Sequence, residues 1–523
     1  MSDRKKRRST KSLTRALALI AAGALSLSLV AESAAQRGFG GGGFGGRGMS
    51  APGNVGGGRM PGGDGPRYPG GGGGMGPIRP GGVIMLPPGG YGPGPGGPGT
   101  VVVIDDGDDA PPRRRKTEQT KKQEQKPQKT QKQIAQRSGF YPPPPGETRF
   151  VPNEVLLNIS GNMSAPALNA LARRHRLTQI ESRDFTLPPR RLARLRIDDG
   201  RPVATVIRSL QQEASILAAQ PNFYFSIEQA ATATAADAPQ YALGKMRLPE
   251  AHALVKGSNI RVAVIDTTID AHHPDLAGTV TATFDAIGKP DKPHAHGTGI
   301  AGIIAAHGKL MGVAPSVKVL AIAAFTSLGT KGSSMAILTG LEYAGTSGAD
   351  VINMSFAGPY DPEMQLKIAA LRKKGAVLIA AAGNAGPQSR PLYPAAYPEV
   401  IAVTATDADD RLFDKANRGT HIAVAAPGVA ILAAAPGESY LMQSGTSFSA
   451  AQVSGVAALL LERNRQLDPE AIRRILTSTA RDLGPVGHDD QFGSGLVDAF
   501  SAVSSAGPMA SEVSASPVSP PAN

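Results

Sequence analysis

The sequence predicts an α/β protein built on a doubly wound parallel sheet, preceded by a small α+β, ferredoxin-like domain and a long disordered N-terminal region. After residue 240, short and nearly continuous apolar runs alternate with helical segments. This alternation is typical of parallel strands buried on both faces. Strand-like and helix-like segments also occur together within the short stretch 147–228, which predicts the small α+β domain. Residues 38–99 contain 30 of the 64 glycines, so they have little apolar surface to bury on folding.

Residues 1–35 have the pattern of a secretory signal peptide. A basic segment ending at Arg15 precedes an apolar run, Ala16 to Ala31, and then the small residues Ser33, Ala34 and Ala35. A membrane anchor is the alternative, but the run is shorter than the ~20 residues that a spanning helix needs. We therefore expect an exported protein, in the periplasm, the cell envelope or the medium.

Residues 36–146 are expected to form a disordered tether, rich first in Gly and Pro and then in Lys and Gln. Residues 1–140 carry 22 Lys and Arg against 9 Asp and Glu, which equals the net charge of the whole chain, +13. The basic balance therefore belongs to the front of the chain, and a folded nucleic-acid-binding domain is disfavoured. The Lys/Arg run 113–137 has no interleaved aromatic residues, which argues against specific nucleic-acid binding. A solvated spacer is the main interpretation, and attachment to an anionic envelope surface is the alternative.

A small domain is expected at 147–228. The sequence suggests the order β-α-β-β-α-β, that of a split-βαβ sandwich. Strand character is found at 151–159, 194–197 and 222–228, and helical periodicity at 164–177 and 202–219.

Residues 229–240 have no apolar core and are expected to be a linker, and the tail 505–523 is expected to be disordered. The chain has no cysteine, which excludes disulfides, a thiolate metal site and a cysteine nucleophile.

The large domain is expected at 241–504. Its predicted strands are 261–266, 317–325, 350–355, 376–382 and 400–406, and its predicted helices are 297–306, 333–347, 362–374, 447–463 and 469–479. In such sheets the functional side chains gather beyond the carboxyl ends of the strands. The residues that end each predicted strand are therefore the first candidates for chemistry.

Four such positions carry the groups that acyl transfer needs. Asp266 ends the first strand, His296 opens a helix, Asn384 follows the fourth strand and Ser447 opens a long apolar helix. Singly, each has an ordinary structural explanation, and a serine at a helix start is usually a cap. Together they supply a nucleophile, a base to activate it, a carboxylate to orient that base and an amide to bind an oxyanion.

The flanking motifs strengthen this interpretation. VAVIDTTID, HGTGIAG, INMSFAG, AAGNAGP and GTSFSAAQVSG occur in this order over residues 262–455, and the chain resembles the subtilisin-like serine peptidases. The resemblance implies a subtilisin-like sheet, a triad of Asp266, His296 and Ser447, and Asn384 as oxyanion donor. It also implies that substrate pairs with the strand made of Ser355, Phe356, Ala357 and Gly358.

The resemblance further implies a precursor that processes itself. Residues 147–228 correspond to the family's inhibitory propeptide, so the expected partners are protein or peptide substrates and the chain's own propeptide. Ala357 and Leu392 stand where many family members have glycine, and we expect them to shrink the specificity pocket and favour cleavage after small residues such as Ala. No cofactor is expected, because the loop after His296 is too short to wrap calcium, although Asp275 matches a calcium ligand of some relatives.

Two alternatives remain open at this stage. Thr268 replaces a usual glycine and Ala451 a usual proline, which leaves room for a catalytically inactive envelope or adhesive protein on the same fold. A metal site built from His272, His273, His294 and His296 is the other alternative, but it gives no role to Ser447 and Asn384. The acidic turn with Asp407, Asp409 and Asp410 is more typical of a solvated loop than of a cation site.

Overall fold

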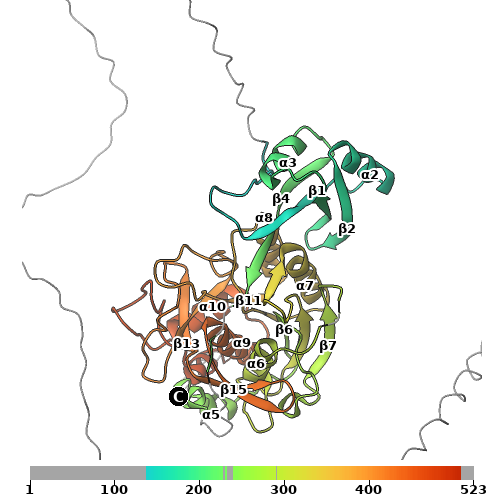
Figure 1. Cartoon of the computed structure of the whole chain (residues 1–523). Coiled ribbons are helices and arrows are strands. Elements are labelled where there is room, and N and C mark those ends of the chain that lie inside the picture. Colours follow the sequence, from blue (N-terminus) through green and yellow to red (C-terminus); the bar gives the residue numbers. More distant parts are fainter. Residues whose placement is uncertain (1–136, 228–229, 233–239, 290, 508–523) are drawn as a thin grey trace, which may run out of the picture. The chain divides into compact units, whose positions relative to one another are not determined.

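A computed structural model describes residues 137–227, 230–232, 240–289 and 291–507. The expected signal peptide, most of the expected tether and nearly all of the expected tail lie outside these residues. The described residues form a small α+β domain followed by a larger α/β domain (Figure 1).

The small domain has the strand and helix order that the sequence suggested. Its elements are β1 (Phe150–Ile159), α2 (Ala165–Arg174), β2 (Leu177–Thr186), β3 (Pro189–Ile197), α3 (Val203–Leu210) and β4 (Ile216–Ser226). The strands pair antiparallel in the order β2-β3-β1-β4. Both helices contribute apolar side chains to one core, in which Leu168 and Val206 pack with Val155 and Leu195 of the sheet.

Three boundaries of this domain differ from the expectation. The helix expected over 202–219 ends at Leu210, and β4 begins at Ile216. The expected order includes a strand at the place of β2, but no segment was assigned to it, and β3 is longer than the predicted segment 194–197. Phe140, which the sequence assigned to the tether, is buried in the domain core and forms a β-bridge with Ala219. Ordered structure therefore begins before residue 147.

The large domain is built on a seven-stranded sheet. Its strands are β6 (Arg261–Asp266), β7 (Val280–Asp285), β8 (Lys318–Ala323), β10 (Val351–Met354), β11 (Val377–Ala381), β12 (Ile401–Thr406) and β13 (Ile422–Pro427). They pair in parallel in the order β13-β12-β11-β10-β6-β8-β7. Because β6 lies between β8 and β10, its carboxyl end lies at the switch point where such sheets place their active groups. The expected doubly wound parallel sheet is confirmed.

Both faces of the sheet are buried, as the continuous apolar runs indicated. In β6, Val262 and Val264 belong to one apolar core, and Ala263 and Ile265 belong to the other. The first core is shared with α6 (Ala295–Ala305) and α9 (Thr446–Arg463), which pack against each other (Figure 1). The second is shared with α7 (Ser334–Thr346) and α8 (Pro362–Lys373).

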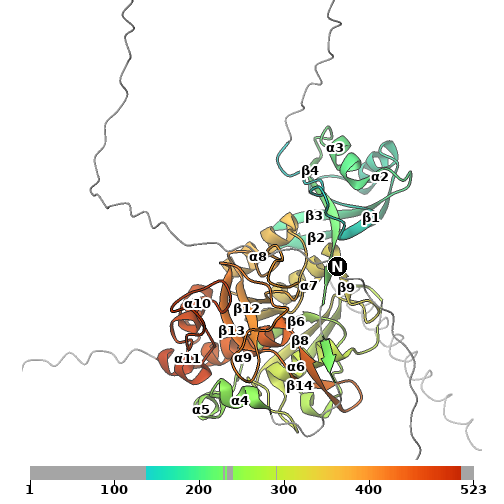
Figure 2. The same cartoon turned by 60° about the vertical axis from the view of Figure 1, so that its left-hand side comes forward.

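The remaining elements lie around this sandwich. They are α4 (Tyr241–Lys245), α5 (Leu248–His252), η1 (Pro274–Leu276), β9 (Lys331–Ser333), α10 (Pro469–Ser478) and α11 (Ala499–Ser505). Helices α10 and α11 contact each other, and α10 also contacts β13 (Figure 2). A three-stranded sheet joins β14 (Ile431–Ala435), β15 (Ser439–Ser444) and β5 (Ala230–Thr232). Strand β5 lies in the expected linker, so part of that linker pairs with the large domain.

Candidate active site

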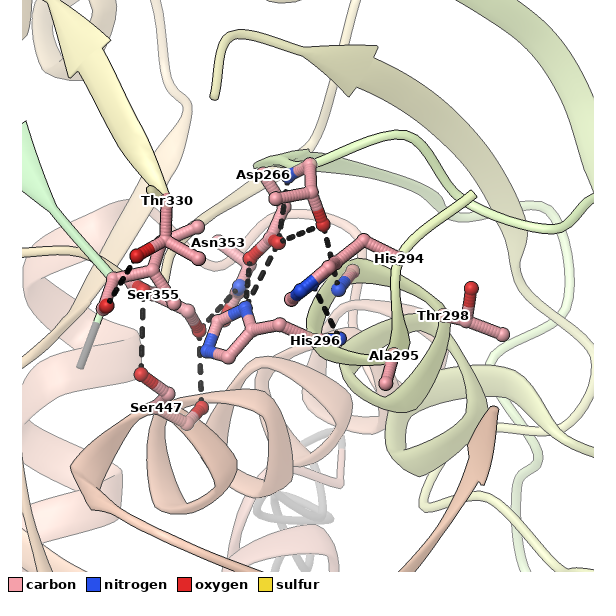
Figure 3. Close-up of polar contacts among 12 residues, drawn as sticks. Asp266, His294, Ala295, His296, Thr298, Thr330, Asn353, Ser355 and Ser447 are labelled. Atoms are coloured by element: carbon pink, nitrogen blue, oxygen red, sulfur yellow. Dashed lines mark hydrogen bonds and ion pairs between the residues drawn. The ribbon is translucent and has the colours of Figure 1, made fainter. Parts of the chain in front are cut away.

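A buried carboxylate and a buried imidazole meet at the carboxyl end of β6. The Asp266 oxygens lie 2.8 and 2.9 Å from Nδ1 of His296, and both side chains are fully buried. Oδ1 of Asp266 also accepts hydrogen bonds from the N–H and hydroxyl of Thr267. A carboxylate that accepts this many donors orients the ring and holds its hydrogen on Nδ1. The Nε2 atom of His296 makes no hydrogen bond with any described residue (Figure 3).

Close packing holds the first turn of α6, which carries His296, against the loop that follows Asp266. The N–H of Gly297 donates to Oγ1 of Thr267 at 3.0 Å. A Cβ atom at Gly297 would lie 2.6 Å from the Thr267 carbonyl oxygen, so only glycine allows this approach. At the next residue, Oγ1 of Thr298 accepts the N–H of Asp270 at 3.0 Å. The HGTG motif thus sets the distance between acid and imidazole.

Ser447 is the second residue of α9 and is almost completely buried. Its Oγ donates to the carbonyl oxygen of Ser355 at 3.2 Å, and its own carbonyl oxygen accepts from Oγ of Ser355 at 3.0 Å. Asn353 and Ser454 continue this buried network, since Asn353 Nδ2 donates to Ser355 and Ser454 Oγ donates to Asn353 Oδ1. Figure 3 shows Ser447 on the side of His296 that faces away from Asp266. The structure therefore brings the three predicted residues together, with the serine hydroxyl turned toward Ser355.

The amide of Asn384 is oriented by the residue that precedes Ser447. Its Oδ1 accepts the N–H of Thr446 at 3.0 Å and the Thr446 hydroxyl at 2.9 Å. Because the oxygen takes both of these donors, the other polar atom of the amide, Nδ2, is a donor. The role of Thr446 was not anticipated, although it lies within the GTSFS motif.

The predicted substrate-binding strand follows β10 and is paired with the end of β4. Ala357 exchanges two backbone hydrogen bonds with Ser226, of 2.9 and 3.0 Å. On the other side, Tyr224, Phe225 and Ser226 pair antiparallel with β9. A segment of the small domain therefore lies as a middle strand between β9 and the strand Ser355–Gly358.

The side chain of Phe225 packs into the apolar core beside this strand. It is fully buried and packs edge-on against Phe356, with the ring centroids 6.0 Å apart. Gly358 is needed here, because a Cβ atom at that position would lie 2.3 Å from Cδ1 of Phe225. Leu392, the expected pocket residue, is 6 % exposed and lies beside Gly383. The contact of Phe225 could not be predicted, because in the sequence this residue is only one of several alternating apolar residues in a predicted strand.

Acidic groups at the start of α8 contact the small domain. Oδ1 of Asp361 accepts from Nε2 of Gln220 at 2.8 Å, and Glu363 lies 3.0 Å from the guanidinium of Arg190. Burial raises the pKa of both Asp361 and Glu363, and the Arg190 charge partly offsets this for Glu363. Burial also lowers the pKa of Lys367 to about 8, although Lys367 pairs with Glu342.

The residues considered for metal binding have other partners. The carboxylate of Asp275 accepts the backbone N–H groups of Lys309 and Leu310 at 2.7 and 3.0 Å. Asp407 and Asp409 lie in a turn in which Asp407 accepts the Asp409 N–H, and Asp410 pairs with a lysine and an arginine. Across the described ranges, no group of three or more His, Asp or Glu is arranged to hold a metal ion, and this includes His272, His273, His294 and His296.

A carboxylate, an imidazole and a serine at the carboxyl edge of a parallel sheet are the arrangement of a serine-type hydrolase. Comparison with known proteins specifies the family. Residues 257–495 match the model of the Subtilase family. The chain is 35% identical to thermitase from Thermoactinomyces vulgaris over 272 residues, which cover 50% of this chain and 95% of thermitase. It is 36% identical to subtilisin E from Bacillus subtilis over 270 residues, 49% of this chain and 69% of that one.

The chain therefore belongs to the subtilase family and is a serine protease that acts on proteins or peptides. A solved structure of fervidolysin from Fervidobacterium pennivorans is similar in fold, with a TM-score of 0.59 and 24% identity. The match covers 69% of this chain and 61% of the fervidolysin chain. The relatives are named as proteases, so the comparisons give no support to the inactive, adhesive alternative. In the part of the chain that the structure describes, no helix has the length and apolarity needed to cross a bilayer.

Proposed function

We propose that this protein is an exported serine endopeptidase that works through Asp266, His296 and Ser447 and is made as a self-processed precursor. The observation that supports the triad is the buried hydrogen bond between Asp266 and His296. The other ring nitrogen of His296, Nε2, lies on the side of Ser447 and has no hydrogen bond with any described residue (Figure 3). A rotation about the Cα–Cβ bond of Ser447 would move its hydroxyl from the Ser355 carbonyl oxygen toward that nitrogen.

The mechanism is hydrolysis in two steps. Ser447 attacks the scissile carbonyl carbon while His296 takes the hydroxyl proton, and Asp266 stabilises the imidazolium that forms. The oxyanion is bound by Nδ2 of Asn384 and by the N–H of Ser447 at the start of α9. His296 then gives its proton to the leaving amine, and water repeats the sequence on the acyl-enzyme.

Substrate binds as an added strand. Ala357 offers both its N–H and its C=O to a neighbouring chain, and these are the groups that Ser226 occupies in this structure. Phe356 and Gly358 pack against Phe225, and Leu392 packs beside Gly383. We assign these residues, with Ser355, to substrate binding.

The small domain acts as an inhibitor in cis. It supplies the strand that competes with substrate, and its contacts with α8 include the ion pair of Arg190 and the hydrogen bond of Gln220. These observations support an inhibitory propeptide that ends near residue 228, joined by the linker 229–240 to a catalytic domain that extends to about residue 504.

The position of Ser447 limits where the chain cuts itself. Before it, Ser226 pairs with Ala357, two residues from Ser355, whose carbonyl oxygen contacts Ser447. After it, Ala230 of β5 pairs with Ser444. The processed bond is therefore one of those between Ile227 and Ala230. None of these bonds follows an alanine, so this proposal departs from the expectation of cleavage after small residues.

Export and attachment rest on the segments outside the described residues. A signal peptide over 1–35 would direct the chain to the periplasm, the envelope or the medium. The basic part of the tether, which precedes the small domain, would then hold the precursor near an anionic envelope surface.

Production of the full chain and of the Ser447→Ala variant tests the proposal. We expect the wild type to shorten, to yield a new N-terminus between Glu228 and Ala230 by mass spectrometry, and to hydrolyse added peptide. Ser447→Ala should remain uncut and inactive. An uncut wild type without peptidase activity, or a variant that still processes itself, would refute the assignment.

A further inference from the structure

A second imidazole lies beside that of His296, and the mechanism above gives it no role. His294 immediately precedes α6, and its Nδ1 accepts a hydrogen bond of 3.2 Å from the backbone N–H of His296 (Figure 3). A backbone N–H can only donate, so this contact requires an unprotonated Nδ1 and leaves the ring hydrogen on Nε2. The hydrogen bond therefore requires His294 to be neutral and selects one tautomer.

The backbone of His294 joins the two halves of the acid–imidazole pair. Its N–H donates to the carbonyl oxygen of Thr268 at 2.9 Å, and its carbonyl oxygen accepts the N–H of Thr298 at 3.2 Å. Thr268 lies two residues after Asp266, and His294 lies two residues before His296. A change at the His294 ring therefore acts directly on the alignment of the Asp266–His296 hydrogen bond.

Burial and the neighbouring imidazole of His296 favour the neutral form of His294. Its ring is half-buried, and this burial, with the neighbouring His296, lowers the pKa of His294. Asp266 and Asp291 act in the opposite direction. Asp266 is bonded to His296, and Asp291 accepts the N–H and hydroxyl of Ser327 at 2.6 and 2.7 Å. Both carboxylates are therefore engaged by other donors.

We propose that His294 is a positioning residue for His296 that acts only as a neutral imidazole, so that the peptidase has a second titrating group in its active site. This inference rests on the proposed function. A proton on Nδ1 would turn the acceptor into a donor that faces the N–H of His296 at the positive end of α6. The added charge would also oppose the imidazolium that His296 must become when it takes the proton of Ser447.

The signature of this role is the shape of the pH profile. One essential imidazole gives an acid limb in which log kcat/KM rises with a slope of one. With His294 as a second group, the slope steepens toward two at low pH. Because the pKa of His294 is lowered, the steeper part lies below the usual histidine value of about 6.5.

The experiment measures kcat/KM of the self-processed enzyme for a quenched fluorescent peptide, from about pH 4.5 to about 9. In His294→Asn the amide oxygen can accept the same N–H but does not titrate. We expect a slope of one throughout the acid limb and a plateau within about twofold of wild type. In His294→Ala the acceptor is lost, so the plateau should fall about five- to tenfold, again with a slope of one. His272→Asn, at an exposed histidine on a nearby loop, should keep the wild-type profile.

Two results with the variants would overturn the inference: a steep acid limb that persists in His294→Asn, or a plateau that is undiminished in His294→Ala. Thermal unfolding at about pH 8 verifies that each variant is folded, and His294→Ser supplies a different acceptor if the asparagine variant is not. An active wild type with a one-proton acid limb refutes this inference alone. A wild type that hydrolyses nothing at any pH refutes the proposed function instead.

Discussion

Phe225 offers the sharpest test of the contact between the small domain and the cleft. Its ring is fully buried against Phe356 and Gly358, at the end of the strand that pairs with Ala357. We expect Phe225→Ala to weaken the hold of this segment on the cleft while leaving the core of the small domain intact, because Phe225 is not part of that core.

The size of the effect follows from the burial. Replacing a buried phenylalanine by alanine costs about 3–5 kcal/mol, through lost apolar contact and the cavity that remains. When the segment leaves the cleft, the Phe225 ring is exposed to water. The substitution therefore destabilises only the form in which the segment occupies the cleft. At about 1.4 kcal/mol for each factor of ten, the open fraction should rise by a factor between about 10² and about 4 × 10³.

The assay follows the reaction of Ser447 with a fluorophosphonate in freshly folded full-length chain. The reagent needs an open cleft, so its labelling rate reports the open fraction when opening and closing are fast. Leu217→Ala is the matched control, because Leu217 lies on the same strand, β4, but its side chain is 50% exposed. This control should be labelled at the wild-type rate.

An unchanged labelling rate in Phe225→Ala, with the protein still folded, would refute this reasoning. It would mean that the backbone pairing of Ser226 with Ala357, or the polar contacts at α8, hold the segment without help from the aromatic ring.

Three further predictions follow from the same contacts. Gly358→Ala places a methyl group 2.3 Å from the Phe225 ring, so labelling should also accelerate, and its effect should shrink when combined with Phe225→Ala. Asn384→Ala should lower kcat with little change in KM, by about 10²–10³-fold if the loss known for the matching donor of subtilisin carries over. Burial raises the pKa of Asp361, so the folded protein holds this proton at pH values where the unfolded chain has lost it. The free energy of unfolding of the wild type should therefore fall as pH rises from about 3.9 through the raised pKa, and Asp361→Asn, measured by denaturant unfolding, should lose less.

The parallel sheet was predictable because several of its strands are continuous apolar runs in the sequence. The runs 261–266, 350–355, 376–382 and 400–406 correspond closely to β6, β10, β11 and β12. Burial on both faces removes polar residues from such strands, so a continuous apolar run leaves few other interpretations.

The residue range of β2 could not be predicted from the sequence, because this strand has little apolar alternation and is held to β3 by cross-strand ion pairs. Its sequence, LTQIESRDFT, is mostly polar, and Asp184 and Glu181 pair with Arg191 and Arg194 of β3. Segment 202–219 was predicted as one helix because Ile216 and Leu217 continue its apolar spacing. The chain instead leaves the helix at Leu210 and turns into β4.

The members of the candidate site were predictable, but their orientations were not. Spacing and motif identified Asp266, His296 and Ser447 without indicating that the serine hydroxyl bonds to Ser355. His294 was considered only as a metal ligand, because histidine is an uncommon helix cap and its role depends on which ring atom faces the helix. Side-chain rotation is decided by neighbours that are distant in sequence, so a single sequence carries little information about it.

The short loop around Asp275 has a consequence for where this enzyme can work. Two peptide N–H groups, from Lys309 and Leu310, donate hydrogen bonds to the carboxylate from within the chain. The chain therefore anchors this corner through its own backbone hydrogen bonds. Chelating or phosphate-rich surroundings should leave it intact.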